Sequence, residues 1–595
     1  MMKKPIEILR ENMKNEGIAG CVIPTGDPHI SEYTADYWKI REYYSGFDGS
    51  AGTLVVTEDN AGLWTDGRYY VQAAKQLAGS GIKLLRAAEK GCISITDYLA
   101  ESLTNGAIVY ISGLTYPTDE MLKIKTALEE KGLKLCTEGD FAGDLWAERP
   151  KQKLTQIYSL EKKYSGKSVV EKLMELRKEL DKNYVNAILL GKLDGIAWLF
   201  NLRASDIHCT PFFISYAFVS QQKAVLFTHL NRMPQSVKYF LEANGIIVKE
   251  YNEVFTFVAE QNNTIKILCD TKEINYSLYT VAQNNKAITI VQKDNPIMLL
   301  KAQKNNTEIS NLHIAYKQDG KVMVEFYAWL FAEMAIGKWY DEYQLAEKIA
   351  QMRKSVDGCI DESFDVIAAY GENAAMCHYA PENGCAKTVE PKGLLLLDNG
   401  GQYLNGTTDT TRTTAMGQVT LPQRLHYTLC LKGLIALSTV IFPEGTTGKQ
   451  LDVLARQSLW KYGLDYRHGT GHGVGYLLSV HEGPHGFGGG SAGNQKLLEG
   501  MVVSIEPGYY EQGSHGIRIE NVVYVTKDTR TEYGQFYRFE TLTRVPLDTD
   551  CLEISLLNDD EINWLNSYHQ KVYQDLAPLV SDAAKKYLEQ KTRPI

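Results

Sequence analysis

An uninterrupted apolar run that ends in a carboxylate constrains the fold of this chain more than any other feature. Residues 394–397 are four leucines, and Asp398 follows them directly before Asn-Gly. This pattern is typical of a buried strand that carries an acid at its tip, next to a turn. Eleven residues later, Asp409 lies in the threonine-rich segment 407–413, which has high β-propensity. The connection is long enough for a hairpin, so Asp398 and Asp409 are expected to face each other.

A second pair of acids repeats this arrangement near the end of the chain. The apolar segment 501–505 leads into Glu506, which precedes Pro-Gly. In the segment 516–523, Arg518 and Glu520 alternate with apolar residues and are expected on one face of a strand. Burying an ionised carboxylate without a partner costs several kcal/mol, so these acids must bind a proton or a cation.

A segment rich in glycine and histidine lies between the two acid pairs. Residues 463–516 hold 15 of the 49 glycines and five of the 12 histidines, which indicates tight turns or close approaches of the backbone. His468 and His472 have the i, i+4 spacing of a helical zinc site, but the glycines around them favour a strand or loop. His481 follows this motif, and His378 lies upstream of the first acid pair.

Each of these residues also has an ordinary structural explanation. Asp398 and Glu506 precede turn residues, Glu520 could lie on the solvated face of an edge strand, and a single histidine is more often structural than catalytic. Their joint order favours a common site, because two divalent cations would nearly neutralise four carboxylates around one imidazole. Oxygen ligands without cysteine favour Mn²⁺ over structural zinc, and leave zinc, cobalt and iron open.

The composition argues against several classes of protein. The chain has 63 basic and 72 acidic side chains and a formal charge of −9, so nothing favours a nucleic acid or an anionic membrane as a partner. Its longest apolar stretch, 434–442, is far shorter than the roughly 20 residues of a membrane span. The first seven residues lack the apolar segment of a secretory signal, and the ten cysteines form no CxxC pair. We therefore expect a cytoplasmic protein with reduced thiols.

The pattern of apolar runs predicts α/β and α+β structure in three units. Strands are expected at 21–24, 53–56, 61–64 and 108–111, and a helix at 169–180 opens a second unit. That unit repeats the order of the first, a strand, an aromatic turn and two short strands, so the two units are expected to be related. Polar stretches near residues 155 and 294–296 predict the domains 1–155, 156–308 and 309–595, and the last forty residues are expected to form a helical tail.

Several longer motifs carry a resemblance to a known family. In chain order they include YYSGFDGSAGTLVVTEDNAGLWTDGRYY, GIAWLFNLRASD, LLLDNGGQYLNGTTDTTRT, LDYRHGTGHGVG, VHEGP, MVVSIEPGYYE and GIRIENVV. Together they resemble the long, three-domain X-prolyl aminopeptidases, the aminopeptidase P group of the pita-bread metallopeptidases of family M24. The resemblance implies two creatinase-like N-terminal α/β domains, a C-terminal pita-bread catalytic domain and a homodimer.

The resemblance also implies roles for nine residues. Five of them would be metal ligands: Asp398, Asp409, His472, Glu506 and Glu520. Asp409 and Glu520 would bridge the two ions. Four would line the substrate site: His378, His468, His481 and Arg518. Arg518 could instead brace the ligand Glu520. Three of the nine, Glu506, His481 and His378, are expected to act in catalysis.

The implied reaction is hydrolysis of the N-terminal Xaa-Pro bond by a hydroxide that bridges two divalent ions, with Mn²⁺ favoured and Zn²⁺ or Co²⁺ as alternatives. The substrates would be peptides with proline in second position. Glu506 would move the proton of the water to the leaving nitrogen, and His481 would donate to the carbonyl oxygen. A prolidase restricted to Xaa-Pro dipeptides and a non-catalytic pita-bread binding module remain alternatives. Prolidases lack the long three-unit layout, and non-catalytic relatives usually lose ligands.

Overall fold

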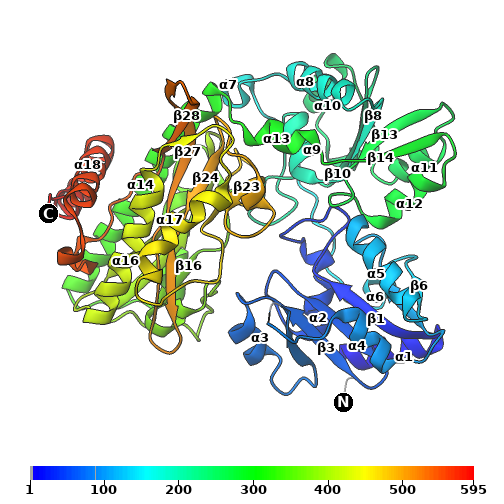
Figure 1. Ribbon diagram of the computed structural model, residues 1–595, viewed down its shortest axis with the longest axis horizontal. Helices are drawn as coiled ribbons and strands as arrows, with labels where there is room; N and C mark the ends of the chain where they lie inside the picture. Colours follow the sequence, from blue (N-terminus) through cyan, green and yellow to red (C-terminus); the bar gives the residue numbers. More distant parts are fainter. Residues whose placement is uncertain (1–3, 88) are drawn as a thin grey trace. The chain divides into compact units, whose positions relative to one another are not determined.

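The computed structural model describes residues 4–87 and 89–595, so the first three residues of the N-terminal segment considered above lie outside it. Contacts divide the chain into two compact units. Unit 1 comprises Met1–Glu161 and Lys167–Ile297, and unit 2 comprises Lys162–Gly166 and Met298–Ile595 (Figure 1). The three predicted domain ranges stay a prediction. All ten cysteines are free thiols. Among the described residues, the helices are too short or too polar to cross a bilayer.

Unit 1 contains two six-stranded sheets of the same topology. Their strand orders are β4-β3-β2-β1-β5-β6 and β12-β11-β10-β8-β13-β14. The strands of the first are β1 (Ile18–Pro24), β2 (Thr53–Thr57), β3 (Ala61–Thr65), β4 (Lys83–Arg86), β5 (Ile108–Ile111) and β6 (Lys134–Cys136). Those of the second are β8 (Ala187–Leu190), β10 (Ser215–Ser220), β11 (Ala224–Thr228), β12 (Ile246–Glu250), β13 (Ile265–Cys269) and β14 (Ile288–Gln292). In each sheet the first strand pairs antiparallel on one side and parallel on the other. The predicted internal repeat is therefore confirmed.

The helices of unit 1 differ from the sequence prediction in one respect. The aromatic turn expected after the first strand of each repeat is a short helix, α2 (Ile40–Ser45) or α9 (Leu193–Leu199). α2 ends at Gly46, whose φ of 70° favours glycine. The predicted helix at 169–180 is α8 (Val169–Lys182), which begins at a capping box. The other longer helices are α1 (Pro5–Asn15), α3 (Tyr70–Gln76), α4 (Ile95–Ser102), α5 (Thr118–Glu130), α10 (Gln235–Ala243), α11 (Glu253–Ala259) and α12 (Tyr276–Asn284).

Unit 2 packs helices against several antiparallel sheets. A six-stranded sheet has the order β21-β28-β27-β24-β22-β23, a three-stranded sheet the order β16-β17-β20, and β25 and β26 form a hairpin. These strands are β16 (Ile367–Tyr370), β17 (Leu394–Asn399), β20 (Thr410–Ala415), β21 (Phe442–Pro443), β22 (Gly471–Gly473), β23 (Glu482–Phe487), β24 (Val502–Ile505), β25 (Gly508–Glu511), β26 (His515–Arg518), β27 (Asn521–Thr531) and β28 (Gly534–Thr541). The longer helices are α13 (Pro296–Ala302), α14 (Asn306–Ala335), α15 (Glu342–Lys354), α16 (Leu421–Ser438), α17 (Gly448–Trp460), α18 (Asp559–Leu576) and α19 (Asp582–Lys591). The predicted helical tail is therefore present as α18 and α19.

Strand β17 shows why its sequence is continuously apolar. It pairs antiparallel with β16 on one side and with β20 on the other. Its leucines belong to different clusters: Leu394 packs with α16 and β24, whereas Leu395 and Leu397 pack with α14 and α15. A strand that is buried on both faces needs apolar residues at every position. Asp398, which follows the four leucines, is therefore held in position by a buried strand.

Candidate metal centre

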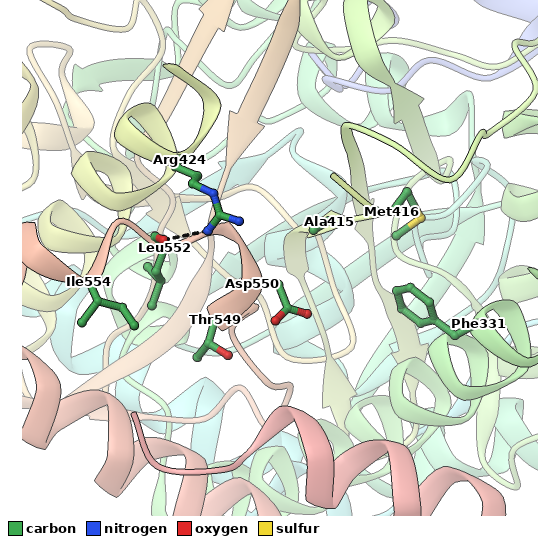
Figure 2. A pocket seen from close by; sticks show the side chains of 9 residues that line it. Phe331, Ala415, Met416, Arg424, Thr549, Asp550, Leu552 and Ile554 are labelled. Carbon is green, nitrogen blue, oxygen red and sulfur yellow. Dashed lines mark hydrogen bonds between the residues drawn. The ribbon is translucent and has the colours of Figure 1, made fainter. Parts of the chain in front are cut away.

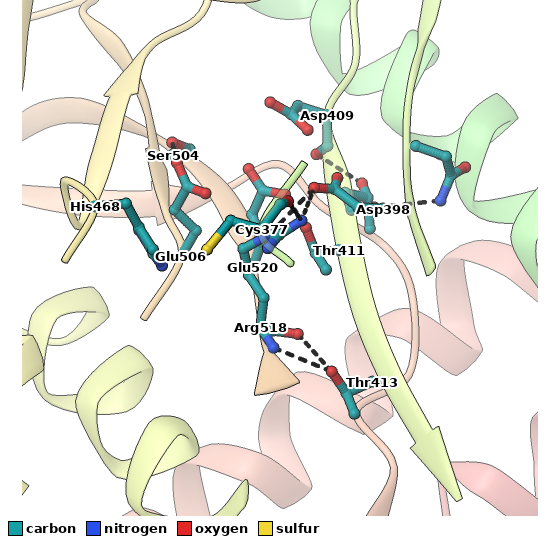
Figure 3. A network of polar contacts seen from close by, with 12 residues as sticks. Cys377, Asp398, Asp409, Thr411, Thr413, His468, Ser504, Glu506, Arg518 and Glu520 are labelled. Carbon is teal, nitrogen blue, oxygen red and sulfur yellow. Dashed lines mark hydrogen bonds and ion pairs between the residues drawn. The ribbon is translucent and has the colours of Figure 1, made fainter. Parts of the chain in front are cut away.

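The five predicted ligands converge in unit 2 from five separate places in the fold. Asp398 lies in β17, Asp409 directly precedes β20, His472 is central in β22, Glu506 directly follows β24, and Glu520 lies between β26 and β27. Figure 3 shows the four carboxylates turned toward a shared region. Carboxylate oxygens of Asp409 and Glu506 each lie 3.4 Å from Nε2 of His472. Donor atoms of Asp409, His472 and Glu520 lie within 4.8 Å of one another.

Three of these four carboxylates are buried and Glu506 is half-buried. The exposed fractions of Asp398, Asp409 and Glu520 are 8%, 4% and 1%. Oδ1 of Asp398 and Oε1 of Glu520 are buried without a hydrogen bond to any residue in the described part of the chain. Burial, followed by the charges of the neighbouring acids, raises the pKa of Glu520 well above its usual range. Divalent cations would offset this cost, so the donor set fits metal ions.

His472 is oriented as a metal-ligating histidine would be. Its Nδ1 lies 2.9 Å from the backbone carbonyl of Gly473, to which it can donate, and this leaves Nε2 facing Asp409 and Glu506. Burial lowers the pKa of His472, but the two carboxylates outweigh burial and raise that pKa to about 9. A cation among these three side chains would take the place of the proton.

Two hydroxyl residues that the sequence did not single out orient these ligands. Oγ1 of Thr411 donates a hydrogen bond to Oε2 of Glu520 at 2.9 Å. Oγ of Ser504 accepts one from the backbone N–H of His472 at 3.0 Å and donates one to Glu506 at 3.2 Å. Both hydroxyl side chains are fully buried. The sequence did contain a sign of the role of Ser504, because it is the one polar residue in the apolar segment 501–505.

Arg518 pairs with a different carboxylate from the one considered in the sequence analysis. Its Nε and Nη2 donate to Oδ2 of Asp398 at 3.1 and 2.5 Å, so Arg518 braces Asp398 rather than Glu520. The predicted continuous strand over 516–523 is divided into β26 and β27, and Glu520 lies in the break. Because the strand is interrupted, Arg518 and Glu520 approach the site from different elements.

Two of the three predicted substrate histidines contact residues of the centre, and the third follows such a residue in sequence. Nε2 of His468 lies 2.8 Å from the hydroxyl of Tyr510, which also accepts a hydrogen bond from Arg518 at 2.9 Å. Burial, and then the charge of Arg518, lowers the pKa of His468 to about 3. The rings of His481 and His472 lie 4.3 Å apart. His378 directly follows Cys377, whose backbone carbonyl accepts a hydrogen bond from Arg518. Substrate binding by these histidines stays a prediction, and Tyr510 is a member that the sequence analysis missed.

Glycines allow the strands that carry these residues to approach closely. A Cβ atom on Gly471 would lie 1.8 Å from the carbonyl oxygen of Ser504, and one on Gly473 would lie 2.1 Å from that of Glu482. Real Cβ atoms do not come so close to other heavy atoms, so only glycine fits at these two positions. The glycines on either side of His472 thus bring β22 against β23 and β24.

A separate open cavity of about 480 Å³ lies elsewhere in unit 2, where residues before the helical tail meet strand β20 (Figure 2). Its lining includes Phe331, Met416, Asp550 and Arg424, and Nη1 of Arg424 donates to the carbonyl of Leu552 at 3.0 Å. None of the nine predicted site residues lines this cavity. It is therefore not part of the candidate metal centre.

Comparisons with known proteins cover nearly the whole chain. The family model for metallopeptidase family M24 matches residues 310–527, and that for the C-terminal region of peptidase M24 matches 535–595. Two models for the creatinase/prolidase N-terminal domain match residues 5–138 and 148–308.

Individual relatives match the chain from end to end. A probable Xaa-Pro aminopeptidase P of Tuber melanosporum is 38% identical over 99% of this chain and 98% of its own length. Aminopeptidase P2 of Arabidopsis thaliana is 37% identical over 97% of this chain and 86% of its own. The crystal structure of X-prolyl aminopeptidase from Caenorhabditis elegans, described as a cytosolic enzyme with a di-nuclear active site, is 32% identical, covers both chains fully and has a TM-score of 0.95. The chain therefore belongs to metallopeptidase family M24.

Proposed function

We propose that this chain is a metal-dependent aminopeptidase that hydrolyses the N-terminal Xaa-Pro bond and releases the first residue of peptides with proline in second position. The observation that carries the proposal is the convergence of three buried carboxylates and the half-buried Glu506 around one imidazole. In the described part of the chain, buried oxygens of Asp398 and Glu520 have no hydrogen-bond partner. End-to-end relatives named Xaa-Pro aminopeptidase P support the substrate class.

The five converging residues would hold two divalent ions, and Asp409 and Glu520 would contribute to both. Bound there, the ions would lower the pKa of a water molecule and polarise the substrate carbonyl. Glu506, whose pKa burial raises, accepts the proton of the attacking water and delivers it to the leaving nitrogen of proline. His481 donates a hydrogen bond to the carbonyl oxygen as negative charge develops on it.

Selectivity for proline follows from a pocket for its ring, since an Xaa-Pro bond has no amide N–H to bind. In our proposal His378 and His468 border this pocket. Arg518 links the pocket to the metal centre, because it binds both Asp398 and Tyr510. Alanine at both histidines should lower kcat/KM for Xaa-Pro peptides. Unchanged cleavage would remove both residues from the substrate site.

The proposal also covers the identity of the metal ion, the oligomeric state, the cellular location and the domain boundaries. Mn²⁺ is the preferred ion because four of the five ligands offer oxygen. A homodimer follows the family resemblance, and a cytoplasmic location is supported by the ten free thiols and by the cytosolic C. elegans relative. The domain ranges 1–155, 156–308 and 309–595 are supported by the four matched regions.

One experiment tests the function against its alternatives. The protein is freed of metal with a chelator, and hydrolysis of Arg-Pro-Pro and of Arg-Pro is followed after Mn²⁺, Zn²⁺ or Co²⁺ is restored singly. We expect no activity without metal, and release of arginine from the tripeptide once Mn²⁺ is added. Cleavage of the dipeptide alone would indicate a prolidase, and metal-independent or absent turnover would contradict the proposal.

A further inference from the structure

A second group of potential metal ligands lies in unit 2, away from the five converging residues. It comprises His426 in α16, Glu511 at the end of β25 and His515 at the start of β26. One donor atom from each of these side chains lies within 4.8 Å of the other two. The exposed fractions of His426 and His515 are 8% and 1%, whereas Glu511 is exposed to solvent. Two buried imidazoles thus lie beneath a carboxylate that an ion can reach.

The two imidazoles already have the separation of ligands that share an ion. Nδ1 of His426 lies 3.0 Å from Nε2 of His515. Two nitrogens bound to zinc at about 2.0–2.1 Å in a tetrahedral site lie about 3.3 Å apart, which is a few tenths of an ångström more than here. The planes of the two rings are nearly parallel, with centroids 5.2 Å apart, so the rings must also rotate to turn both nitrogens toward one ion. Without an ion, one of these nitrogens carries a proton and donates a hydrogen bond to the other. An ion between them would displace that proton, which can move to the outer nitrogen of the same ring.

Neighbouring residues hold both rings in place. Nδ1 of His515 lies 2.8 Å from the hydroxyl of Ser514, which leaves its Nε2 facing His426. Tyr509 packs on His426 with ring centroids 4.1 Å apart. The third donor, Glu511, is paired with His515 in the register of the hairpin, and its carboxylate lies 3.7 Å from Nδ1 of that ring. Since Glu511 is exposed, its side chain can rotate toward an ion without repacking the core.

We propose that His426, Glu511 and His515 form a third divalent-cation site that prefers Zn²⁺. Two imidazoles and one carboxylate form a donor set that zinc binds well, with water in the remaining position, whereas the all-oxygen character that suits Mn²⁺ is absent here. An ion at this site would join α16 to the β25–β26 hairpin.

The hairpin links this site to the candidate metal centre. Tyr510 is the neighbour of Glu511 in β25, and Arg518 lies at the other end of the hairpin, opposite Gly508. Arg518 binds both Tyr510 and Asp398. Arg518 lies three residues beyond His515 in β26, which is about 10 Å along a strand. The third ion would therefore stabilise the position of Tyr510 and Arg518 without contacting substrate.

The test compares metal content and affinity in the full-length protein. Protein already saturated with Mn²⁺ is titrated with ZnCl₂, and total bound metal is measured by mass spectrometry after removal of free ions. We expect three equivalents in the wild type and two in H426Q and H515Q. Because Glu511 is exposed, E511Q should fold normally and weaken binding of the third ion at least tenfold. H313Q changes a histidine elsewhere in unit 2 and should keep three equivalents.

Thermal unfolding provides a second readout that does not depend on activity. Added Zn²⁺ should raise the Tm of the Mn²⁺-loaded wild type and of H313Q, but not that of H426Q. The proposal is overturned if the wild type and all site variants bind the same number of ions with the same affinity. It is also overturned if zinc only replaces Mn²⁺ and the total stays at two equivalents. The proposed peptidase activity would stand in either case, because it does not depend on these three residues.

Discussion

Replacing Thr411 with valine should weaken metal binding while leaving the fold in place. Its hydroxyl donates to Oε2 of Glu520 at 2.9 Å, and valine has nearly the same shape without that donor. In the metal-free protein, burial raises the pKa of Glu520, which disfavours the ionised carboxylate. The charge-assisted hydrogen bond therefore forms fully only when Glu520 is ionised, as it is when it binds a cation.

The size of the effect follows from this difference between the two states. A hydrogen bond to a charged group contributes about 1.5–3 kcal/mol. Because each 1.4 kcal/mol corresponds to a factor of ten, Thr411→Val should raise the metal dissociation constant by about 10- to 150-fold. Losses of about 10- to 100-fold are usual when a residue that orients a metal ligand is removed.

Thr413→Val is the matched control. Thr413 is equally buried and lies on the same face of β20, but its hydroxyl bonds only to the backbone N–H and carbonyl of Arg518. Metal affinity is measured by competition with a coloured chelator, and folding by circular dichroism. We expect Thr413→Val to lower the Tm but to keep the wild-type affinity. The reasoning is refuted if Thr411→Val binds metal as tightly as the wild type, or if both variants lose affinity equally.

Three further predictions concern the same centre. Apparent metal affinity should rise at least tenfold per pH unit below pH 9. The carboxylate neighbours of His472 raise its pKa to about 9 against the effect of burial, and His472 must lose its proton to bind an ion. A calorimetric profile that is flat below that pH would contradict this. Arg518→Gln leaves Asp398 buried without the guanidinium that pairs with it, which costs about 3–5 kcal/mol. The Tm should therefore fall more in metal-free than in metal-loaded protein. Equal falls in the two forms would argue against this role. Gly471→Ala should yield misfolded or strongly destabilised protein because its Cβ meets a carbonyl oxygen of β24 at 1.8 Å, whereas Gly489→Ala, with no atom within 4 Å, should behave as the wild type in thermal unfolding.

Much of the fold could be predicted because its signals are local. The leucine run before Asp398 required a strand buried on both faces, and the structure has β17 there. The repeated order of strands in the first two units appears as two sheets of one topology. The glycines around His472 indicated close backbone approaches, which occur between neighbouring strands.

The pairing of atoms in the candidate metal centre depended on tertiary structure. The alternation around Arg518 predicted one strand, but the chain breaks before Glu520, and the guanidinium reaches a carboxylate 120 residues away. The role of Thr411 likewise depends on Glu520, which is 109 residues distant in sequence.

The sequence by itself thus determined that several carboxylates end in an apolar interior and need cations, because the cost of burying charge is a property of the residues and their immediate neighbours. Tertiary structure decided which side chains share each contact. That choice depends on strand register and on where strands break, and both are set by packing between segments far apart in the chain.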